Sequence, residues 1–159
     1  MKQKVFLITG FQNWGKSFII EKLFNKKRFR QNKLYNFCDK NFLVQLASND
    51  DWGEKGYIKS IKEKLNKFNS NPNYIISAFC PTKESVNDSK KIINSLFQNA
   101  EIYMIVLKYK WCLHAQLDIE EIKKYYEDIK NLKIIVIDEK DPDKKSPIIK
   151  EKICKIVKN

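Results

Sequence analysis

A glycine-containing loop between an apolar run and a helical stretch constrains the fold of this chain more than any other feature. Residues 5–9, Val-Phe-Leu-Ile-Thr, are apolar and partly β-branched, which is typical of a buried strand. Residues 10–17, Gly-Phe-Gln-Asn-Trp-Gly-Lys-Ser, match the pattern G-x-x-x-x-G-K-[ST] at every fixed position. Residues 18–24 then continue as a helical stretch. The sequence therefore predicts a strand, a tight loop and a helix in direct succession.

Each fixed position of this loop has a chemical reason. Gly10 and Gly15 let the backbone turn so that its N–H groups face inward around a phosphate chain. The N-terminus of the following helix adds positive potential. Lys16 is long enough to reach the β- and γ-phosphates, and the Ser17 hydroxyl is a suitable ligand for Mg²⁺. The residues expected to contact a nucleotide are Gly10, Phe11, Gln12, Asn13, Trp14, Gly15, Lys16, Ser17 and Phe18.

With this loop in its strand–loop–helix setting, the chain resembles the P-loop NTPase superfamily. The resemblance implies a nucleoside triphosphate as ligand and Mg²⁺ as the accompanying metal. ATP is favoured over GTP, because the chain has no Asn-Lys-x-Asp motif to read a guanine base.

Strand-like and helix-like segments alternate over residues 1–159, and no internal repeat or inserted domain interrupts them. The expected strands are 5–9, 42–47, 74–79, 102–107 and 133–138, and the later helices are 54–69, 86–97, 118–129 and 146–157. Ser146 and Pro147 are expected to begin the last helix as its N-cap and first-turn proline. This alternation predicts one α/β domain, a three-layer sandwich with a five-stranded parallel sheet. The resemblance implies the P-loop kinase-like strand order 2-3-1-4-5, with the ligand at the carboxyl ends of the strands.

Two acidic residues, Asp50 and Asp51, follow the second predicted strand. The stretch Asn49-Asp50-Asp51-Trp52 is similar to one in small P-loop kinases of the polynucleotide kinase and adenylylsulfate kinase types. That similarity implies that Asp51, or else Asp50, accepts a proton from a substrate hydroxyl or holds Mg²⁺ through water. Lys16, Asp51 and Asp50 are thus the catalytic candidates, and Ser17 and Asp51 the metal-binding candidates. The alternative is an aspartate-rich turn that caps the next helix.

Other residues at the same edge of the predicted sheet depart from the kinase pattern. The third strand carries Ser77 where an acidic residue is usual. Asp138 and Glu139 resemble the end of a Walker B strand, but the implied strand order places them two strands from the loop. We therefore expect them beside the nucleotide base or at the end of an edge strand.

Nucleotide kinases usually close a lid with several arginines over the phosphates, and this positive clamp is reduced here. No arginine follows Arg30, so only the lysines Lys83, Lys108 and Lys110 remain near the predicted site. Lysine offers a point charge where arginine offers a bidentate fork. Trp14 and Trp111 could stack on a base or meet a partner, with ordinary packing as the alternative. Another chain, either a protein partner or a second copy, could therefore complete the site.

Composition limits the environment and the partners. The net charge is +12, carried almost entirely by lysine, and we expect solvated helix faces, with a nucleic-acid surface as the weaker alternative. No apolar run is long enough for a transmembrane helix, and only four residues precede the first strand, too few for a signal peptide. The single histidine, His114, provides no zinc ligand set. The widely spaced cysteines are expected to be free thiols in a reducing cytoplasm; they are Cys38, Cys80, Cys112 and Cys154.

Two functions from different classes fit these features. The first is a small kinase that transfers the γ-phosphate of Mg²⁺-ATP to a hydroxyl of a small molecule, a nucleotide or a nucleic-acid end. The second is a nucleotide-binding regulatory or assembly subunit with slow or partner-dependent hydrolysis. The missing lid arginines, the serine at position 77 and an expected exposed Trp14 favour the second.

Overall fold

The central strand of the sheet is the buried apolar run that precedes the glycine-containing loop. The structure is a computed structural model that describes residues 1–110 and 115–159. Strand β1 (Lys4–Thr9) lies between the parallel strands β4 (Tyr74–Phe79) and β7 (Glu101–Leu107). The side chains of residues 5–8 have exposed fractions of 0%. A continuous apolar run is what a strand covered on both faces requires.

The main sheet contains six strands in the order β2-β3-β4-β1-β7-β8. Its remaining strands are β2 (Tyr35–Phe37), β3 (Lys40–Gln45) and β8 (Leu132–Ile137). The five parallel strands, numbered along the chain, keep the order 2-3-1-4-5. The expected count of five was wrong, because β2 adds an antiparallel edge strand beside β3.

Strand β2 escaped prediction because neither its length nor its turn gives a strong signal. It has three residues, and its turn to β3 is Cys38-Asp39, with φ angles of 52° and 61°. Such two-residue turns usually carry Asn-Gly or Asp-Gly, because both positions need a positive φ. The pair Cys38-Asp39 is not a recognised sequence pattern for such a turn, so the turn was not predicted.

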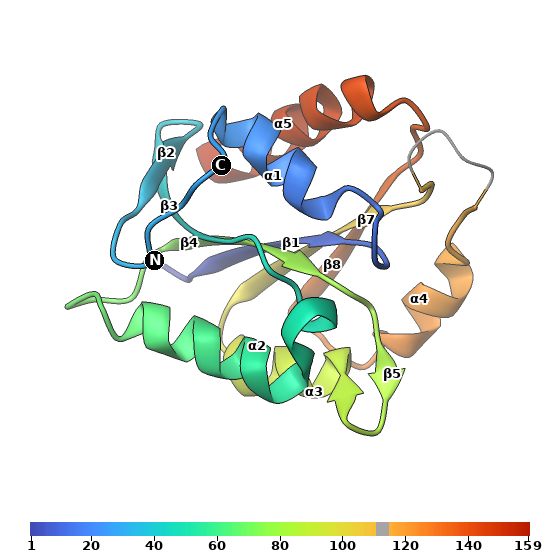
Figure 1. Cartoon of the computed structure of the whole chain (residues 1–159), viewed down its shortest axis with the longest axis horizontal. Coiled ribbons are helices and arrows are strands. Elements are labelled where there is room, and N and C mark those ends of the chain that lie inside the picture. The colour runs from blue at the N-terminus through green and yellow to red at the C-terminus, as the bar shows by residue number, and fades with distance from the viewer. Residues whose placement is uncertain (111–114) are drawn as a thin grey trace.

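Helices cover both faces of the sheet. Figure 1 shows α1 (Lys16–Phe24) and α5 (Pro142–Lys158) over one face, and α2 (Asn49–Leu65) and α3 (Ser89–Leu96) over the other. Helix α4 (Ile119–Tyr125) precedes β8. A separate two-stranded sheet, β5 (Lys83–Glu84) with β6 (Asn87–Asp88), replaces the expected start of the third helix. No helix in the described ranges has both the length and the apolar character needed to cross a membrane.

Two helices begin earlier than expected, and their caps explain why. Helix α2 begins at Asn49 because Ser48 caps it, and it continues through a kink at Gly53, where φ is 71°. Helix α5 begins at Pro142 because the Asp141 side chain accepts a hydrogen bond from the backbone N–H of Asp143. Ser146 and Pro147 were therefore wrongly expected to start the last helix; they lie within its first two turns.

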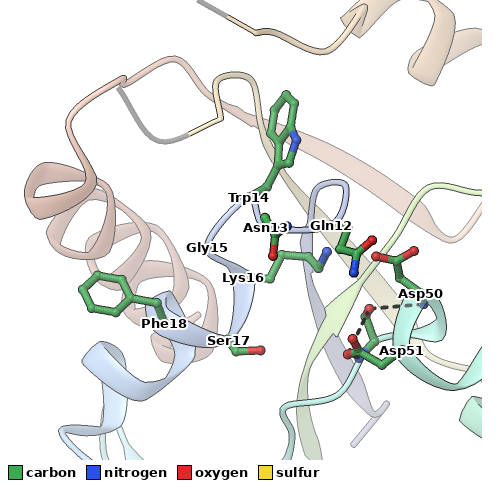
Figure 2. Close-up of a pocket in the computed structure, with 10 residues that line it drawn as sticks. Gln12, Asn13, Trp14, Gly15, Lys16, Ser17, Phe18, Asp50 and Asp51 are labelled. Carbon is green, nitrogen blue, oxygen red and sulfur yellow. Dashed lines mark hydrogen bonds between the residues drawn. The ribbon is translucent and has the colours of Figure 1, made fainter. Parts of the chain in front are cut away.

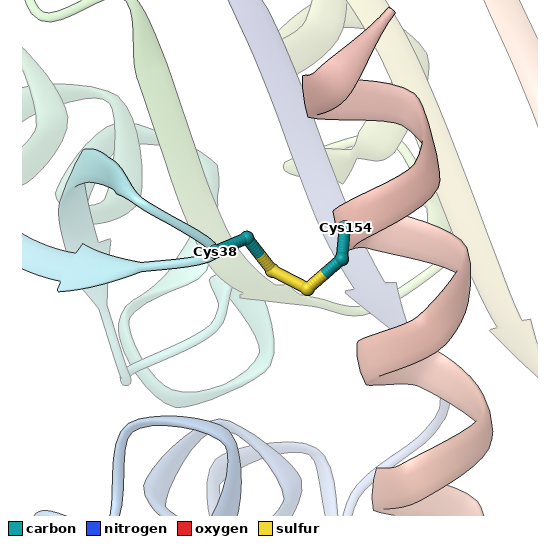
Figure 3. Close-up of a disulfide and its surroundings, with 2 residues drawn as sticks. All are labelled: Cys38 and Cys154. Carbon is teal, nitrogen blue, oxygen red and sulfur yellow. A yellow bond between two sulfur atoms is a disulfide. The ribbon is translucent and has the colours of Figure 1, made fainter.

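A disulfide joins two distant parts of the chain on the α5 side of the sheet. Cys38, at the tip of the β2–β3 hairpin, is bonded to Cys154 on α5 (Figure 3), with 5.2 Å between their Cα atoms and a sequence separation of 116. The expectation of free thiols was wrong for this pair, so their spacing is no argument for a reducing compartment. Cys80 is a free, buried cysteine as expected. Cys112, Trp111 and His114 lie outside the described residues.

We predict that loss of this disulfide lowers the free energy of unfolding by about 4–5 kcal/mol, because the bond closes a very long loop in the unfolded chain. Urea unfolding of the oxidised protein, of the same protein with reductant, and of Cys154→Ser measures this. The reduced wild type and the variant should have the same lower midpoint, and reductant should not affect the variant further. Equal midpoints for oxidised and reduced wild type would contradict the prediction.

Candidate functional site

A pocket of about 310 Å³ lies where the loop after β1 meets the N-terminus of α2. Figure 2 shows side chains from both elements around it. The residues that line it are Gln12, Asn13, Trp14, Gly15, Lys16, Ser17, Phe18, Ser48, Asp50 and Asp51. The structure thus brings together most of the expected loop residues and both candidate carboxylates. Gly10 and Phe11 belong to the loop and face Lys16 through their carbonyl groups.

The two glycines of the loop serve different purposes. Gly15 has a φ of 83° and immediately precedes α1, a left-handed conformation that favours glycine. Gly10 has no positive φ, but a Cβ atom there would lie 3.0 Å from the Cβ of Trp14. Gly10 is therefore required by the close approach of Trp14.

Trp14 is a packing residue of the loop, since its exposed fraction is 6%. Its ring lies edge-to-face with that of Phe11, with 6.0 Å between the ring centroids. Figure 2 shows its side chain pointing away from Lys16 and the two aspartates. An exposed Trp14 that stacks on a base or a partner is therefore not what the structure shows, and the packing alternative describes this residue.

Lys16 closes the loop on itself. Its Nζ donates to the carbonyl oxygens of Gly10 and Phe11, at 2.8 Å each. Burial lowers the pKa of Lys16, and the charges of Cys80, Asp50 and Asp51 oppose this shift. An ammonium group with an exposed fraction of 7% for its residue needs such partners, because an unpaired buried charge is costly. These two carbonyls therefore place the positive charge at the base of the pocket.

Asp51 and Ser48 form a capping box at the start of α2. An Asp51 carboxylate oxygen accepts a hydrogen bond from the backbone N–H of Ser48 at 2.9 Å, and the Ser48 hydroxyl accepts one from the backbone N–H of Asp50 at 3.2 Å. The capping role proposed as an alternative for the aspartate pair therefore exists for Asp51. Ser48 was not among the expected site residues, although the spacing Ser-x-x-Asp is the pattern of such a box.

Asp50 has different surroundings from its neighbour. It lines the pocket and is partly exposed, and no hydrogen bond or ion pair to its carboxylate is present within the described ranges. Of the two aspartates, it also raises the pKa of Lys16 more. Asp50 is therefore the carboxylate of this pocket that is available to a ligand.

Buried hydrogen bonds hold the start of α2 against the end of β4. The Asn49 side chain is fully buried and exchanges two hydrogen bonds with the backbone of Cys80, at 2.8 and 3.0 Å. Its amide nitrogen also donates to Thr82 and Asn87. Asn49 thereby fixes the position of the adjacent Asp50. No sequence pattern signals this contact, because Asn49 and Cys80 meet only in the folded chain.

Several other candidates from the sequence lie away from the pocket. Ser77 is fully buried, and its hydroxyl lies 2.6 Å from that of Tyr57. Asp138 pairs with Lys108 at 3.5 Å, and Glu139 accepts a hydrogen bond from the backbone of Asp141. None of these side chains lines the pocket.

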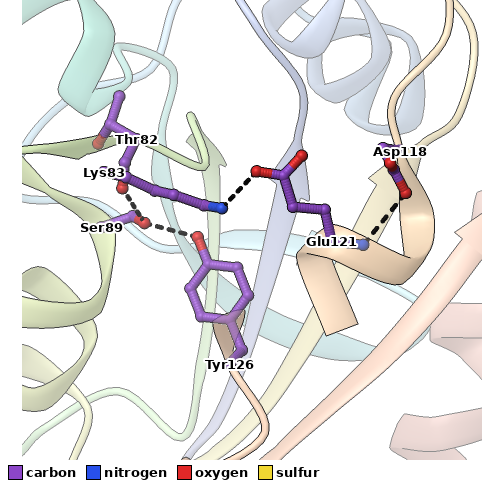
Figure 4. Close-up of polar contacts among 6 residues, drawn as sticks. All are labelled: Thr82, Lys83, Ser89, Asp118, Glu121 and Tyr126. Carbon is purple, nitrogen blue, oxygen red and sulfur yellow. Dashed lines mark hydrogen bonds and ion pairs between the residues drawn. The ribbon is translucent and has the colours of Figure 1, made fainter. Parts of the chain in front are cut away.

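The lysines proposed as a phosphate clamp are also engaged elsewhere. Lys83 forms an ion pair with Glu121 of α4 at 2.7 Å (Figure 4). Close to this pair, the hydroxyl oxygens of Ser89 and Tyr126 are hydrogen-bonded at 2.5 Å. These contacts join the segment around the β5–β6 hairpin to α4. Lys108 pairs with Asp138, and Lys110 does not line the pocket. Of the pocket residues in the described ranges, Lys16 alone carries a positive charge.

The residues of the pocket fit a Mg²⁺ ion that is brought with a polyphosphate. The Ser17 hydroxyl, which donates to the carbonyl oxygen of Leu46 at 3.0 Å, and the carboxylate of Asp50 lie in the same pocket. Mg²⁺ typically takes one or two protein oxygens and fills its other positions with water and phosphate oxygens. No cluster of three histidine, cysteine or acidic side chains suited to a metal occurs in residues 1–110 and 115–159. The protein alone would thus supply only part of the coordination.

Comparisons with known proteins give limited information. No protein-family model matches the sequence, and a search of curated proteins finds no match. Shikimate kinase from Bacteroides thetaiotaomicron is similar in structure over 100% of each chain, with 11% sequence identity and a TM-score of 0.45. A similarity at this level does not identify an activity. The loop sequence and the order of the parallel strands are in themselves consistent with a P-loop kinase fold.

We predict that Asn49→Ala lowers the free energy of unfolding by about 2–4 kcal/mol, because it leaves the buried N–H and carbonyl of Cys80 without their partner. The exposed Asn69→Ala is the matched control and should change stability by less than about 0.5 kcal/mol. Urea unfolding curves of both variants test this. Equal stabilities for the two variants would show that Asn49 does not hold α2 in place.

Proposed function

We propose that the protein binds Mg²⁺-ATP in the loop of residues 10–18 and transfers the γ-phosphate to a hydroxyl group. The observation that carries the proposal is a pocket that contains the buried Lys16 ammonium, the Ser17 hydroxyl and the available Asp50 carboxylate. The acceptor would be a small molecule, a nucleotide or a nucleic-acid end. ATP is favoured over GTP as the donor.

Each side chain has a defined role in this proposal. Lys16 neutralises charge on the transferring phosphate, which requires its ammonium to exchange the carbonyls of Gly10 and Phe11 for phosphate oxygens. Mg²⁺, held by Ser17 and through water by an aspartate, would neutralise further phosphate charge when bound. Asp50 accepts the proton of the acceptor hydroxyl, since the Asp51 carboxylate is already committed to the cap of α2.

A second function is favoured by one observation. The pocket contains no arginine and one lysine, so the positive charge that usually accelerates phosphoryl transfer is reduced. A nucleotide-binding subunit with slow hydrolysis, completed by a protein partner or a second copy of the chain, would need no further cation of its own.

We predict that Lys16→Met weakens Mg²⁺-ATP binding about 10- to 100-fold, since a charge-assisted contact to phosphate is lost. Lys55→Met, a change of the same type at an exposed position of α2, should leave the affinity within twofold. Isothermal titration calorimetry with ATP, with and without Mg²⁺, measures both. If wild type has no Mg²⁺-dependent affinity for ATP or GTP, the nucleotide site does not exist.

We further predict that Asp50→Asn lowers acceptor-dependent ADP formation by at least about 100-fold while ATP affinity and stability stay close to wild type. Asp51→Asn should instead lower the unfolding free energy by about 1 kcal/mol through the weakened cap. Nucleosides, sugars and 5′-hydroxyl oligonucleotides serve as acceptors in a coupled ADP assay. Tight ATP binding without turnover on any acceptor would support the regulatory subunit and rule against the kinase.

A further inference from the structure

The positive charge of the chain is concentrated on one layer of the fold. Residues 17–33, which include most of α1 and the loop that follows it, hold six lysines and arginines against one acidic residue. Residues 141–158, which form α5 with its cap, hold six lysines against three acidic residues. Together they supply eight of the twelve net positive charges. Residues 49–99, on the α2–α3 side of the sheet, hold eight lysines against six acidic residues.

Apart from Lys145, which is buried, the basic side chains of this layer are exposed and form a continuous surface. The chain's two arginines, Arg28 and Arg30, both lie in the exposed loop after α1. Lys22 lines two adjoining hollows, one with Lys26 and Lys27 and one with Lys150 of α5. Among the described residues, no ion pair joins an exposed lysine or arginine of these two segments to a carboxylate. The surface therefore keeps its positive potential.

The hollow between α1 and α5 contains an unusual polar group. The Ser146 Oγ is buried and has no hydrogen-bond partner within the described ranges. It belongs to a hollow of about 390 Å³ that is also lined by Lys22, Lys150 and Asp143. The two lysines outnumber the single carboxylate, so the hollow carries a net positive formal charge.

We propose that this α1–α5 surface, defined by residues 17–33 and 141–158, binds the phosphate backbone of a nucleic acid. Helix α5 has 17 residues and is therefore about 25 Å long, which matches about seven nucleotide steps of a duplex. Arg28 and Arg30 supply forks for phosphate oxygens. The disulfide between Cys38 and Cys154 holds the hairpin that follows the basic loop against α5.

The apolar residues on the surface distinguish this partner from a lipid bilayer. The exposed large hydrophobic side chains of the described chain are Met1, Phe11, Trp52 and Val86. None lies in residues 17–33 or 141–158, so this surface offers no group to insert into the acyl region of a membrane. It also offers no exposed aromatic ring for base stacking. The binding is thus directed to the backbone, independent of sequence, and does not depend on the nucleotide pocket.

Fluorescence anisotropy with a labelled 20-base-pair duplex, from 50 to 200 mM KCl, tests this. The wild type should show a slope of log affinity against log salt of about −4 or steeper, which corresponds to about five phosphate contacts. Lys22→Glu/Arg28→Glu/Lys150→Glu should bind at least tenfold more weakly than the matched control Lys55→Glu/Lys59→Glu/Lys67→Glu, which has the same net charge on the opposite layer. Circular dichroism verifies that both triple variants are folded.

One further variant sharpens the test. Lys16→Met should bind the duplex as wild type does, which separates this surface from the proposed nucleotide site. Equal weakening by the two triple variants, no binding at 50 mM KCl, or tighter binding to phosphatidylserine vesicles than to the duplex would each overturn the proposal.

Discussion

The contact between the Lys16 ammonium and the carbonyls of Gly10 and Phe11 is the interaction on which the site depends. These hydrogen bonds hold a buried positive charge inside the loop. The cost of burying that charge is thus met by the loop itself. In the proposed function, a polyphosphate would replace the two neutral carbonyl acceptors of Lys16 with charged phosphate oxygens. Charged oxygens form stronger hydrogen bonds with an ammonium group. The loop is therefore stable without a ligand and still complementary to one.

The pocket is rigid because the ends of two parallel strands, β3 and β4, are bonded to its walls. The backbone N–H of Gly10 donates to the carbonyl oxygen of Phe79 at the end of β4. The Ser17 hydroxyl donates to the carbonyl oxygen of Leu46 just after β3. Asn49 ties the start of α2 to Cys80. Each wall of the pocket thus has a direct hydrogen bond to a neighbouring strand end. This arrangement fixes Lys16 and Asp50 before any ligand arrives, which reduces the reorganisation that binding requires.

The sequence predicted the features that depend on local patterns. The apolar run of β1 and the loop of residues 10–17 follow from periodicity and from one strong motif, whereas the order of the parallel strands was implied by the resemblance to P-loop kinases. The sequence could not predict the pairing of Cys38 with Cys154 or the Asn49 hydrogen bonds, because their partners meet only through the fold. It also favoured Asp51 over Asp50 as the catalytic carboxylate, whereas the structure leaves Asp50 as the available one. Their difference arises from the capping geometry of α2, where one carboxylate turns back to the Ser48 backbone and its neighbour faces the pocket.

The distribution of charge explains why a divalent cation belongs in the proposed chemistry. The pocket contains one lysine and two aspartates, so its formal charge is negative although the chain as a whole is strongly basic. A triphosphate placed there would face like charges at short range, and these interactions are screened least in a partly buried site. Mg²⁺ held by Ser17 would reverse this balance, since its two positive charges would make the aspartates favourable neighbours. The lysines of the α1–α5 surface do not line the pocket, and their charge serves a different contact.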